Sequence, residues 1–270
     1  MSVLRLRGAR GGHVVIAQAN VPVIGARHHF LLTRLHSLSG VVPIGLFVIF
    51  HLAVNASVLA GPETFQRNVD LIHSIRPFLT TAEFAFIFVP ISYHAILGVR
   101  IWWWSRSNVW RYPYGGNIRY TLQRVTGLVA LVFIVFHVLQ MNWLGEPFKA
   151  KGGNAFNPDP PWAAWSCAEA IQASPWIAPW YAIGIVAVCY HMANGFWTFL
   201  ISWGIIAGTT AMRKAGYACL VIGILVGGMG LAALRAFSGV PPHKLLPGRS
   251  MQTAARAGHP SPGAAPALER

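Results

Sequence analysis

Long apolar runs dominate this chain. Five of them are long enough to cross a lipid bilayer as helices, since a spanning helix needs about 20 apolar residues. The predicted segments are Leu38–Leu59, Phe84–Trp104, Leu122–Leu144, Ile177–Ile206 and Ala215–Phe237. Each run mixes Gly, Ser, Thr or Asn with larger apolar residues. That mixture favours helices packed on one another, because small residues let helix backbones approach closely. The pattern therefore predicts an all-α fold, an integral membrane five-helix bundle.

The rest of the chain divides into two terminal regions and one long connection. Residues 1–30 form a predicted N-terminal cytoplasmic extension, and residues 31–238 the five-helix domain. Residues 239–270 are rich in Pro, Gly, Ala and Ser, which predicts a disordered tail. Residues 145–176 predict a long loop outside the membrane. Its aromatic residues, interpreted as interfacial anchors, are Trp162, Trp165 and Trp176.

The composition supports a membrane protein and excludes other classes. Of the 270 residues, 54% are hydrophobic and only 10% are charged, whereas a soluble chain carries about 25% charged residues. The cysteines Cys167, Cys189 and Cys219 form no CxxC pair. This excludes a disulfide framework, a thiolate zinc site and an iron–sulfur cluster on this chain. The sequence also has no CxxCH motif, so any haem would be bound non-covalently.

The net charge of +14 is interpreted mainly as a signal of membrane orientation. Basic residues without acids precede the first segment and fill the connection between the second and third segments. The acids that come before the tail fall on the opposite side and are Glu63, Asp70, Glu83, Glu146, Asp159 and Glu169. Because cytoplasmic loops are enriched in Lys and Arg, we expect the N-terminus inside the cell and the C-terminus outside. The basic face would also suit an acidic soluble partner or anionic lipid headgroups.

Four histidines lie inside the first four predicted segments, one in each: His51, His94, His137 and His191. A lone membrane histidine is more often a hydrogen-bond partner between helices than a metal ligand. Four such residues, one per helix, suggest ligation. At a rise of about 1.5 Å per residue, His51 and His137 lie roughly 12 and 10 Å from the outer ends of their helices and can meet. The pairing of His94 with His191 requires the fourth helix to extend past Ser202.

Two histidine pairs at two depths would hold two planar cofactors, one above the other. Bis-histidine ligation of haem b needs one imidazole from each of two facing helices. It also needs small residues beside the macrocycle. The small residues predicted on the same helix faces as the histidines are Gly40, Gly98, Thr126 and Gly195. We therefore expect the bundle to enclose two stacked b-type haems.

Haem propionates are anions and need basic or hydroxyl partners. Candidate partners cluster at the inner ends of the first and third segments: Arg34, His36, Ser37, Arg124 and Thr126. The alternative role for the arginines is anchoring at the membrane edge.

Six short motifs occur in order along these helices. They are Arg34-Leu-His-Ser-Leu-Ser-Gly40, Phe50-His51-Leu52, Tyr93-His94, Gln123-Arg-Val-Thr-Gly127, Phe136-His137-Val138 and His191-Met-Ala-Asn-Gly195. Over about residues 30–238 the chain resembles the cytochrome b subunit of succinate dehydrogenase and fumarate reductase, of the single-chain, five-helix, dihaem type.

The resemblance implies that His94 and His191 bind a haem near the cytoplasmic side, and that His51 and His137 bind one near the outer side. It also implies two partners on the basic inner face: a flavoprotein with covalent FAD and an iron–sulfur protein. Electrons would pass between them and a quinone, usually menaquinone, near the outer haem. A glutamate in a similar place in that family favours Glu83 as a proton relay. Its alternative role is a solvated helix-start residue stabilised by the helix dipole.

Three other functions remain as alternatives. A dihaem cytochrome b could anchor a different quinone-linked enzyme, such as a hydrogenase or formate dehydrogenase, although the first and fourth motifs argue against this. A transporter or proton channel would need histidines along one pathway rather than paired at two depths. A purely structural anchor would leave four membrane histidines without a role.

Overall fold

The computed structural model describes residues 5–7, 13–15, 23–105, 107–144 and 155–241. Five helices in it are long and apolar enough to cross a membrane: His28–Ala60, Arg76–Trp104, Gly115–Leu144, Ile177–Ser202 and Thr209–Gly239. The predicted all-α bundle of five spanning helices is confirmed. Most helices begin before the predicted apolar run, because backbone hydrogen bonding continues into polar residues at the membrane edge. The fourth helix ends at Ser202 rather than at Ile206.

Three of the five spanning helices contain a short π-helical segment. The first span consists of α1 (Val23–Ser39), η1 (Gly40–Gly45), α2 (Leu46–Ala56) and the 3₁₀ turn η2 (Ser57–Ala60). The second consists of α4 (Arg76–Glu83), η3 (Phe84–Phe88) and α5 (Val89–Trp104). The third consists of α6 (Gly115–Val138) and η4 (Leu139–Leu144). Such wide turns change which residues face a neighbouring helix and are frequent at functional sites. Pro43, which has no backbone N–H to donate, lies inside η1.

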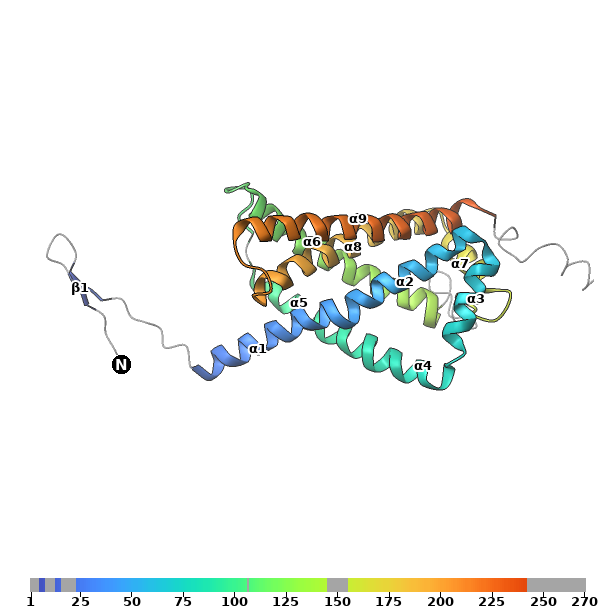
Figure 1. The fold of residues 1–270 in the computed structure, drawn as a ribbon, viewed down its shortest axis with the longest axis horizontal. Helices are drawn as coiled ribbons and strands as arrows, with labels where there is room; N and C mark the ends of the chain where they lie inside the picture. Colours follow the sequence, from blue (N-terminus) through green and yellow to red (C-terminus); the bar gives the residue numbers. More distant parts are fainter. Residues whose placement is uncertain (1–4, 8–12, 16–22, 106, 145–154, 242–270) are drawn as a thin grey trace, which may run out of the picture.

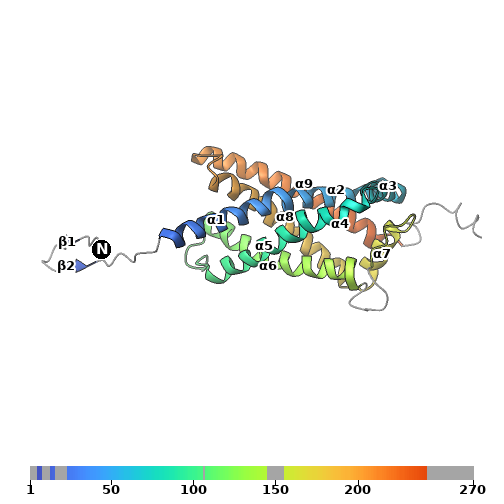
Figure 2. The same cartoon turned by 90° about the horizontal axis from the view of Figure 1, so that it is seen from below.

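The first and third spans pack against the fourth and fifth, α8 (Ile177–Ser202) and α9 (Thr209–Gly239). These two lie side by side along the bundle, and α6 packs against α8 while α2 packs against α9. The second span lies beside the first, with α1 against α5 (Figures 1 and 2). This arrangement leaves two cavities inside the bundle, and the histidines line them.

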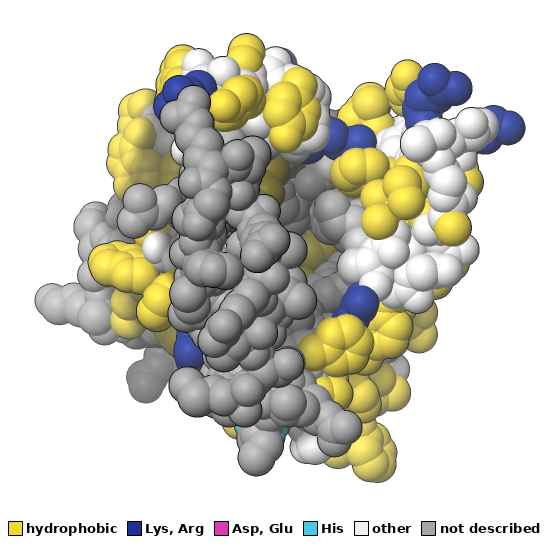
Figure 3. All heavy atoms as spheres, turned by 90° about the vertical axis from the view of Figure 1, so that its left-hand side faces the viewer, with side chains coloured by type: hydrophobic (Ala, Val, Ile, Leu, Met, Phe, Trp, Pro, Cys, Tyr) yellow, Lys and Arg dark blue, Asp and Glu magenta, His cyan; other side chains and the backbone are white. Residues whose placement is uncertain are grey.

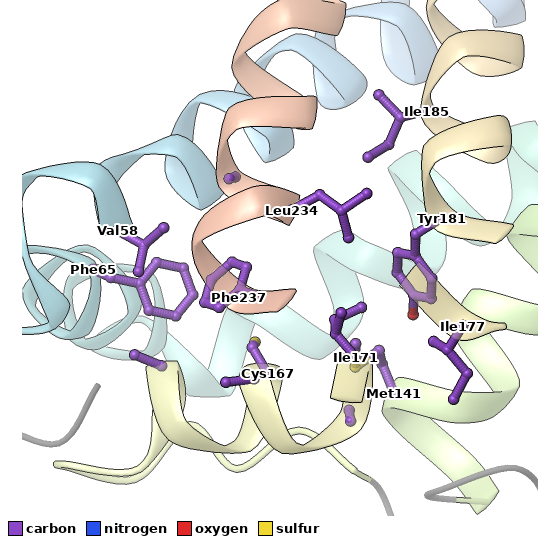
Figure 4. Packing of buried hydrophobic residues seen from close by; sticks show 14 of the residues in the cluster. Val58, Phe65, Met141, Cys167, Ile171, Ile177, Tyr181, Ile185, Leu234 and Phe237 are labelled. Carbon is purple, nitrogen blue, oxygen red and sulfur yellow. The ribbon is translucent and has the colours of Figure 1, made fainter. Parts of the chain in front are cut away.

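Two short helices, α3 (Pro62–His73) and α7 (Ala163–Gln172), cover one end of the bundle (Figure 1). We call this end the outer end and the opposite one the inner end, after the orientation that the charge pattern predicts. Figure 4 shows α7 beneath the buried hydrophobic cluster, with Phe65 of α3 beside Phe237 of α9. Gln66 of α3 connects the two helices by hydrogen bonds. It accepts from the backbone N–H of Ala163, the first residue of α7, at 3.0 Å, and it donates to the carbonyl of Pro158, which precedes α7, at 2.9 Å. The region that we predicted as an outer loop thus contains a buried helix. Its alanines are small enough to pack closely against α3 and α9.

Two short strands are described in the N-terminal region. The two strands β1 (Arg5–Arg7) and β2 (His13–Val15) pair antiparallel, and α1 begins at Val23, inside the predicted N-terminal extension. Most of the predicted disordered tail, residues 242–270, lies outside the described residues.

Candidate functional site: two histidine pairs in two cavities

The first cavity, of about 330 Å³, lies toward the inner end of the bundle and is lined by residues of α1, η1, α5, α6 and α8. His94 of α5 and His191 of α8 face each other across it. Their ring centroids are 6.1 Å apart and the rings are nearly perpendicular, at 89°. Nδ1 of His94 lies 2.9 Å from the carbonyl oxygen of His36, and Nδ1 of His191 lies 3.0 Å from that of Gln123. A carbonyl oxygen only accepts, so each Nδ1 carries the proton and each Nε2 is the unprotonated nitrogen that could bind a metal. Nε2 of His191 lies 3.5 Å from the side-chain nitrogen of Gln123, a long contact that a metal could replace.

Two glycines make room for these rings. A Cβ atom added to Gly40 would lie 2.5 Å from Cε1 of His94, and one added to Gly127 would lie 2.7 Å from Cε1 of His191. Both separations are shorter than van der Waals contact, so each imidazole rests directly against a glycine of a neighbouring helix. Gly98 faces His36, and Gly195 faces Gln123. All four glycines line the inner cavity.

The inner cavity also contains two buried nitrogen atoms without a hydrogen-bond partner among the described residues, Nδ1 of His36 and Nε of Arg124. His36 stacks on His94, with ring centroids 4.0 Å apart. Arg124 lies over the ring of Tyr120 and donates to the Tyr120 carbonyl at 3.3 Å. Unpaired buried polar groups are costly, and an anionic group bound in this cavity would supply acceptors for them. Ser37 lines the same cavity.

Two other residues predicted to bind the propionates, Arg34 and Thr126, do not line the inner cavity. Arg34 donates to the backbone carbonyl of Ser202 and stacks over Phe30 and Trp203. These contacts fit an anchor at the inner end of the bundle. Thr126 donates its hydroxyl to the Leu122 carbonyl of its own helix at 2.6 Å. The next residue, Gly127, is the one that lines the cavity.

The second cavity, of about 590 Å³, lies toward the outer end of the bundle. His51 of α2 and His137 of α6 face each other in it, with ring centroids 5.8 Å apart and the rings at 74°. Nδ1 of His137 lies 3.1 Å from the hydroxyl of Tyr181. Glu83, Asn55 and Asn142 line the same cavity, and Asn55 donates to the backbone carbonyl of His51 at 2.9 Å.

The spacing within each pair suits a metal held between two imidazoles. An imidazole nitrogen lies about 2 Å from a metal that it binds, so two rings on opposite sides of one metal have centroids about 6 Å apart. Two histidines supply too few ligands for a bare metal ion. They match the two axial positions of iron in a macrocycle that brings four nitrogen ligands of its own.

Comparison with known proteins identifies the family, although no family model matches the chain. The succinate dehydrogenase cytochrome b558 subunit of Bacillus subtilis (strain 168) is 34% identical to it over 214 residues. The match covers 79% of this chain and 100% of that relative. The chain belongs to the succinate dehydrogenase cytochrome b subunit family. The resemblance drawn from the six motifs is thereby confirmed.

In this family member, sequence reasoning missed a polar network behind the inner pair. Arg119 donates to Asn194 at 3.1 Å, and Asn194 donates to the side chain of Gln123 at 2.8 Å. Gln123 in turn donates to the His191 carbonyl at 3.1 Å. Arg119 also lies over the ring of Trp197, 3.7 Å from its centroid. Gln123 and Asn194 do stand in the quoted motifs, but only the packing of α6 on α8 brings them together.

A further group missed from the sequence lies behind the outer pair. Tyr181 is 6% exposed and Gln140 is fully buried, and the two are hydrogen-bonded at 2.7 Å. Cys167 of α7 lines the cavity, and burial raises the pKa of its thiol to about 12. At neutral pH this group is therefore an uncharged thiol.

Proposed function

We propose that this chain binds two haem b groups and carries electrons between the iron–sulfur subunit of a succinate dehydrogenase complex and a quinone. As a member of its family the chain is a membrane subunit of such a complex. The observation that carries the proposal is the geometry of the two histidine pairs. Each pair faces a cavity with ring centroids about 6 Å apart, the spacing expected for two axial ligands of one iron.

At the inner site, His94 and His191 would be the axial ligands. The carbonyl groups of His36 and Gln123 hold the protons on the two Nδ1 atoms and so direct each Nε2 toward the iron. The unpaired nitrogens of His36 and Arg124 would bind the propionates.

At the outer site, His51 and His137 would be the axial ligands. Gly127, against which His191 rests, precedes His137 by ten residues on the continuous helix α6. At about 1.5 Å per residue, the two levels are separated by roughly 15 Å along the bundle. When bound, each haem would accept and donate one electron at its level. The two haems together would carry electrons from the inner face to the outer cavity.

The inner face would dock the soluble subunits. The described acids belong to α3, α4, α7 and the segment before α7, all toward the outer end. In Figure 3, which views the opposite end, Lys and Arg side chains are visible and no acidic side chain is seen among the described atoms. This asymmetry supports a cytoplasmic N-terminus. It also supports docking of a flavoprotein with FAD and an iron–sulfur protein there, with the dicarboxylate chemistry on those chains.

The quinone would be reduced beside the outer cavity, and menaquinone is the form that the resemblance implies. This cavity is the larger of the two and extends from the histidine pair to Glu83 of α4. Glu83 is half-buried and is the carboxylate that lines the cavity. We propose that it relays protons to the quinone.

Haem content tests the proposal. A pyridine haemochrome assay with reduced-minus-oxidised spectra on the purified complex should give two b-type haems per chain. His94→Ala and His137→Ala should each leave one haem, with different spectra. His73→Ala provides the control, because His73 lies in the outer helix α3 and bonds the Val69 carbonyl; it should keep two. A parent complex without haem would refute the proposal, and one haem would show that one pair is not a ligand pair.

A further inference from the structure

A buried chain of hydrogen bonds leads from the outer cap helix α7 to His137. The carbonyl oxygen of Ala170 lies 3.1 Å from the side-chain nitrogen of Gln140. The side-chain oxygen of Gln140 lies 2.7 Å from the Tyr181 hydroxyl, which lies 3.1 Å from Nδ1 of His137. These hydrogen bonds thus connect α7, η4, α8 and α6. Each of them joins two residues that are at least 30 positions apart in the sequence.

The direction of every hydrogen bond in this chain follows from its first member. The Ala170 carbonyl can only accept, so the amide NH₂ group of Gln140 points toward it and the amide oxygen points toward Tyr181. The Tyr181 hydroxyl has one proton, and it donates this proton to Gln140. Its oxygen is then left to accept from His137, and the proton of that imidazole lies on Nδ1.

Packing holds the Tyr181 ring where this chain needs it. Phe133 meets the Tyr181 ring edge-on, with centroids 5.1 Å apart, and stacks on His137 at 5.9 Å. Gly184, one turn after Tyr181 on α8, admits the Phe133 ring, because a Cβ atom at this position would overlap it. Figure 4 shows the Tyr181 hydroxyl pointing from α8 toward the side on which α7 lies. Neither the tyrosine nor the glutamine has a solvent-facing alternative, since both are buried.

We infer that Tyr181 and Gln140 are positioning residues for the outer haem: their hydrogen-bond chain places the proton of His137 on Nδ1 and leaves Nε2 for the iron. This inference rests on the proposed function, in which His137 is an axial ligand. At the inner site backbone carbonyls do the same for His94 and His191. For His137 at the outer site, the acceptor is the side chain of Tyr181. A substitution can therefore remove this hydrogen bond without changing the backbone.

The expected effect has a definite sign. A hydrogen bond from Nδ1–H to an acceptor makes the imidazole a stronger electron donor. A stronger donor stabilises ferric iron more than ferrous iron. Loss of the acceptor should therefore raise the midpoint potential of the outer haem and leave the inner haem unchanged.

The test uses the intact complex with Tyr181→Phe, which removes only the hydroxyl. Redox titration should show an upward shift for one haem, and electron paramagnetic resonance should show a changed low-spin ferric signal for the same haem. Gln140→Leu keeps the hydroxyl but removes its acceptor, so it should give a smaller shift of the same sign. Tyr217→Phe is the matched control, since Tyr217 lies on α9 and is 64% exposed; it should leave both haems unchanged.

The outcomes separate the two proposals. A parent complex without an outer haem refutes the proposed function itself. Two haems in Tyr181→Phe with unchanged potentials and unchanged resonance signals overturn the inference alone. Complete loss of the outer haem in both Tyr181→Phe and Gln140→Leu also overturns it, because removing one partner of a metal ligand typically weakens metal binding by about 10- to 100-fold rather than abolishing it.

Discussion

Substitution of Gly127 by alanine should selectively weaken the inner haem site. The added Cβ atom would lie 2.7 Å from Cε1 of His191, about 1 Å closer than van der Waals contact allows. The His191 ring cannot simply turn away, because its Nδ1 is hydrogen-bonded to the Gln123 carbonyl at 3.0 Å. The ring must therefore shift and lengthen this bond, or the helices must separate.

The magnitude follows from overpacking. An extra methyl group in a close-packed interior typically costs about 1–3 kcal/mol. If that cost acts on the haem-bound state, the affinity for the inner haem falls by roughly 5- to 150-fold, since about 1.4 kcal/mol corresponds to a factor of ten. Gly40→Ala should act on the same haem through the other ligand, because its Cβ atom would lie 2.5 Å from Cε1 of His94.

The assay is the haem content per chain and the difference spectrum of the complex after repeated detergent washing. Gly127→Ala should lose the inner haem before the outer one. Gly228→Ala is a matched control, because no heavy atom lies within 4 Å of its added Cβ atom; it should keep both haems. Full retention of an unshifted inner haem in Gly127→Ala would refute the contact argument.

Three further predictions concern the proton, the potential and the membrane field. Glu83→Gln should keep both haems but reduce quinone turnover by about 100-fold or more; unchanged turnover would reject the relay. Arg124→Gln should lower the midpoint potential of the inner haem, because a cation that lines the cavity favours the less positive ferrous state; an equal shift of both haems would contradict this placement. An uncoupler should slow succinate oxidation by menaquinone in intact membranes, because an electron moving outward gains about 2.3 kcal/mol per 100 mV. Equal rates with and without uncoupler would argue against transfer across the membrane.

The amino-acid pattern alone was enough to predict the class of the fold and the depth of the outer histidine pair. Apolar runs of about 20 residues have few alternatives to membrane helices, and all five were found. A constant rise per residue converts a position in such a run into a depth. For this reason the contact between His51 and His137 could be predicted from their depths along the helices alone. For the inner pair the depth count was wrong: it required the fourth helix to extend past Ser202, but the helix ends at Ser202 and His94 and His191 still face each other.

Which helix faces meet could not be predicted from the sequence, because it depends on how the helices pack. The spacing between Gly40 and His51 was counted on an uninterrupted α-helix, but the π-helical segment η1 lies between them. Gly40 lies at the inner level, as expected, and the packing of the first span on α5 places it against His94. On α6, the residue that borders the inner cavity is Gly127 and not the predicted Thr126. The reason is the packing of α6 on α8, which places His191 against Gly127.

The hydrogen-bond partners of the ligands depend on packing in the same way. Tyr181 and Gln140 carry no periodic or motif signal, and their role follows from α7 folding back over the outer end of the bundle. Depth along a helix is a property of the sequence, because the rise per residue is constant. Rotation about the helix axis and the choice of neighbour are properties of the packed bundle, because they depend on side chains of several helices at once.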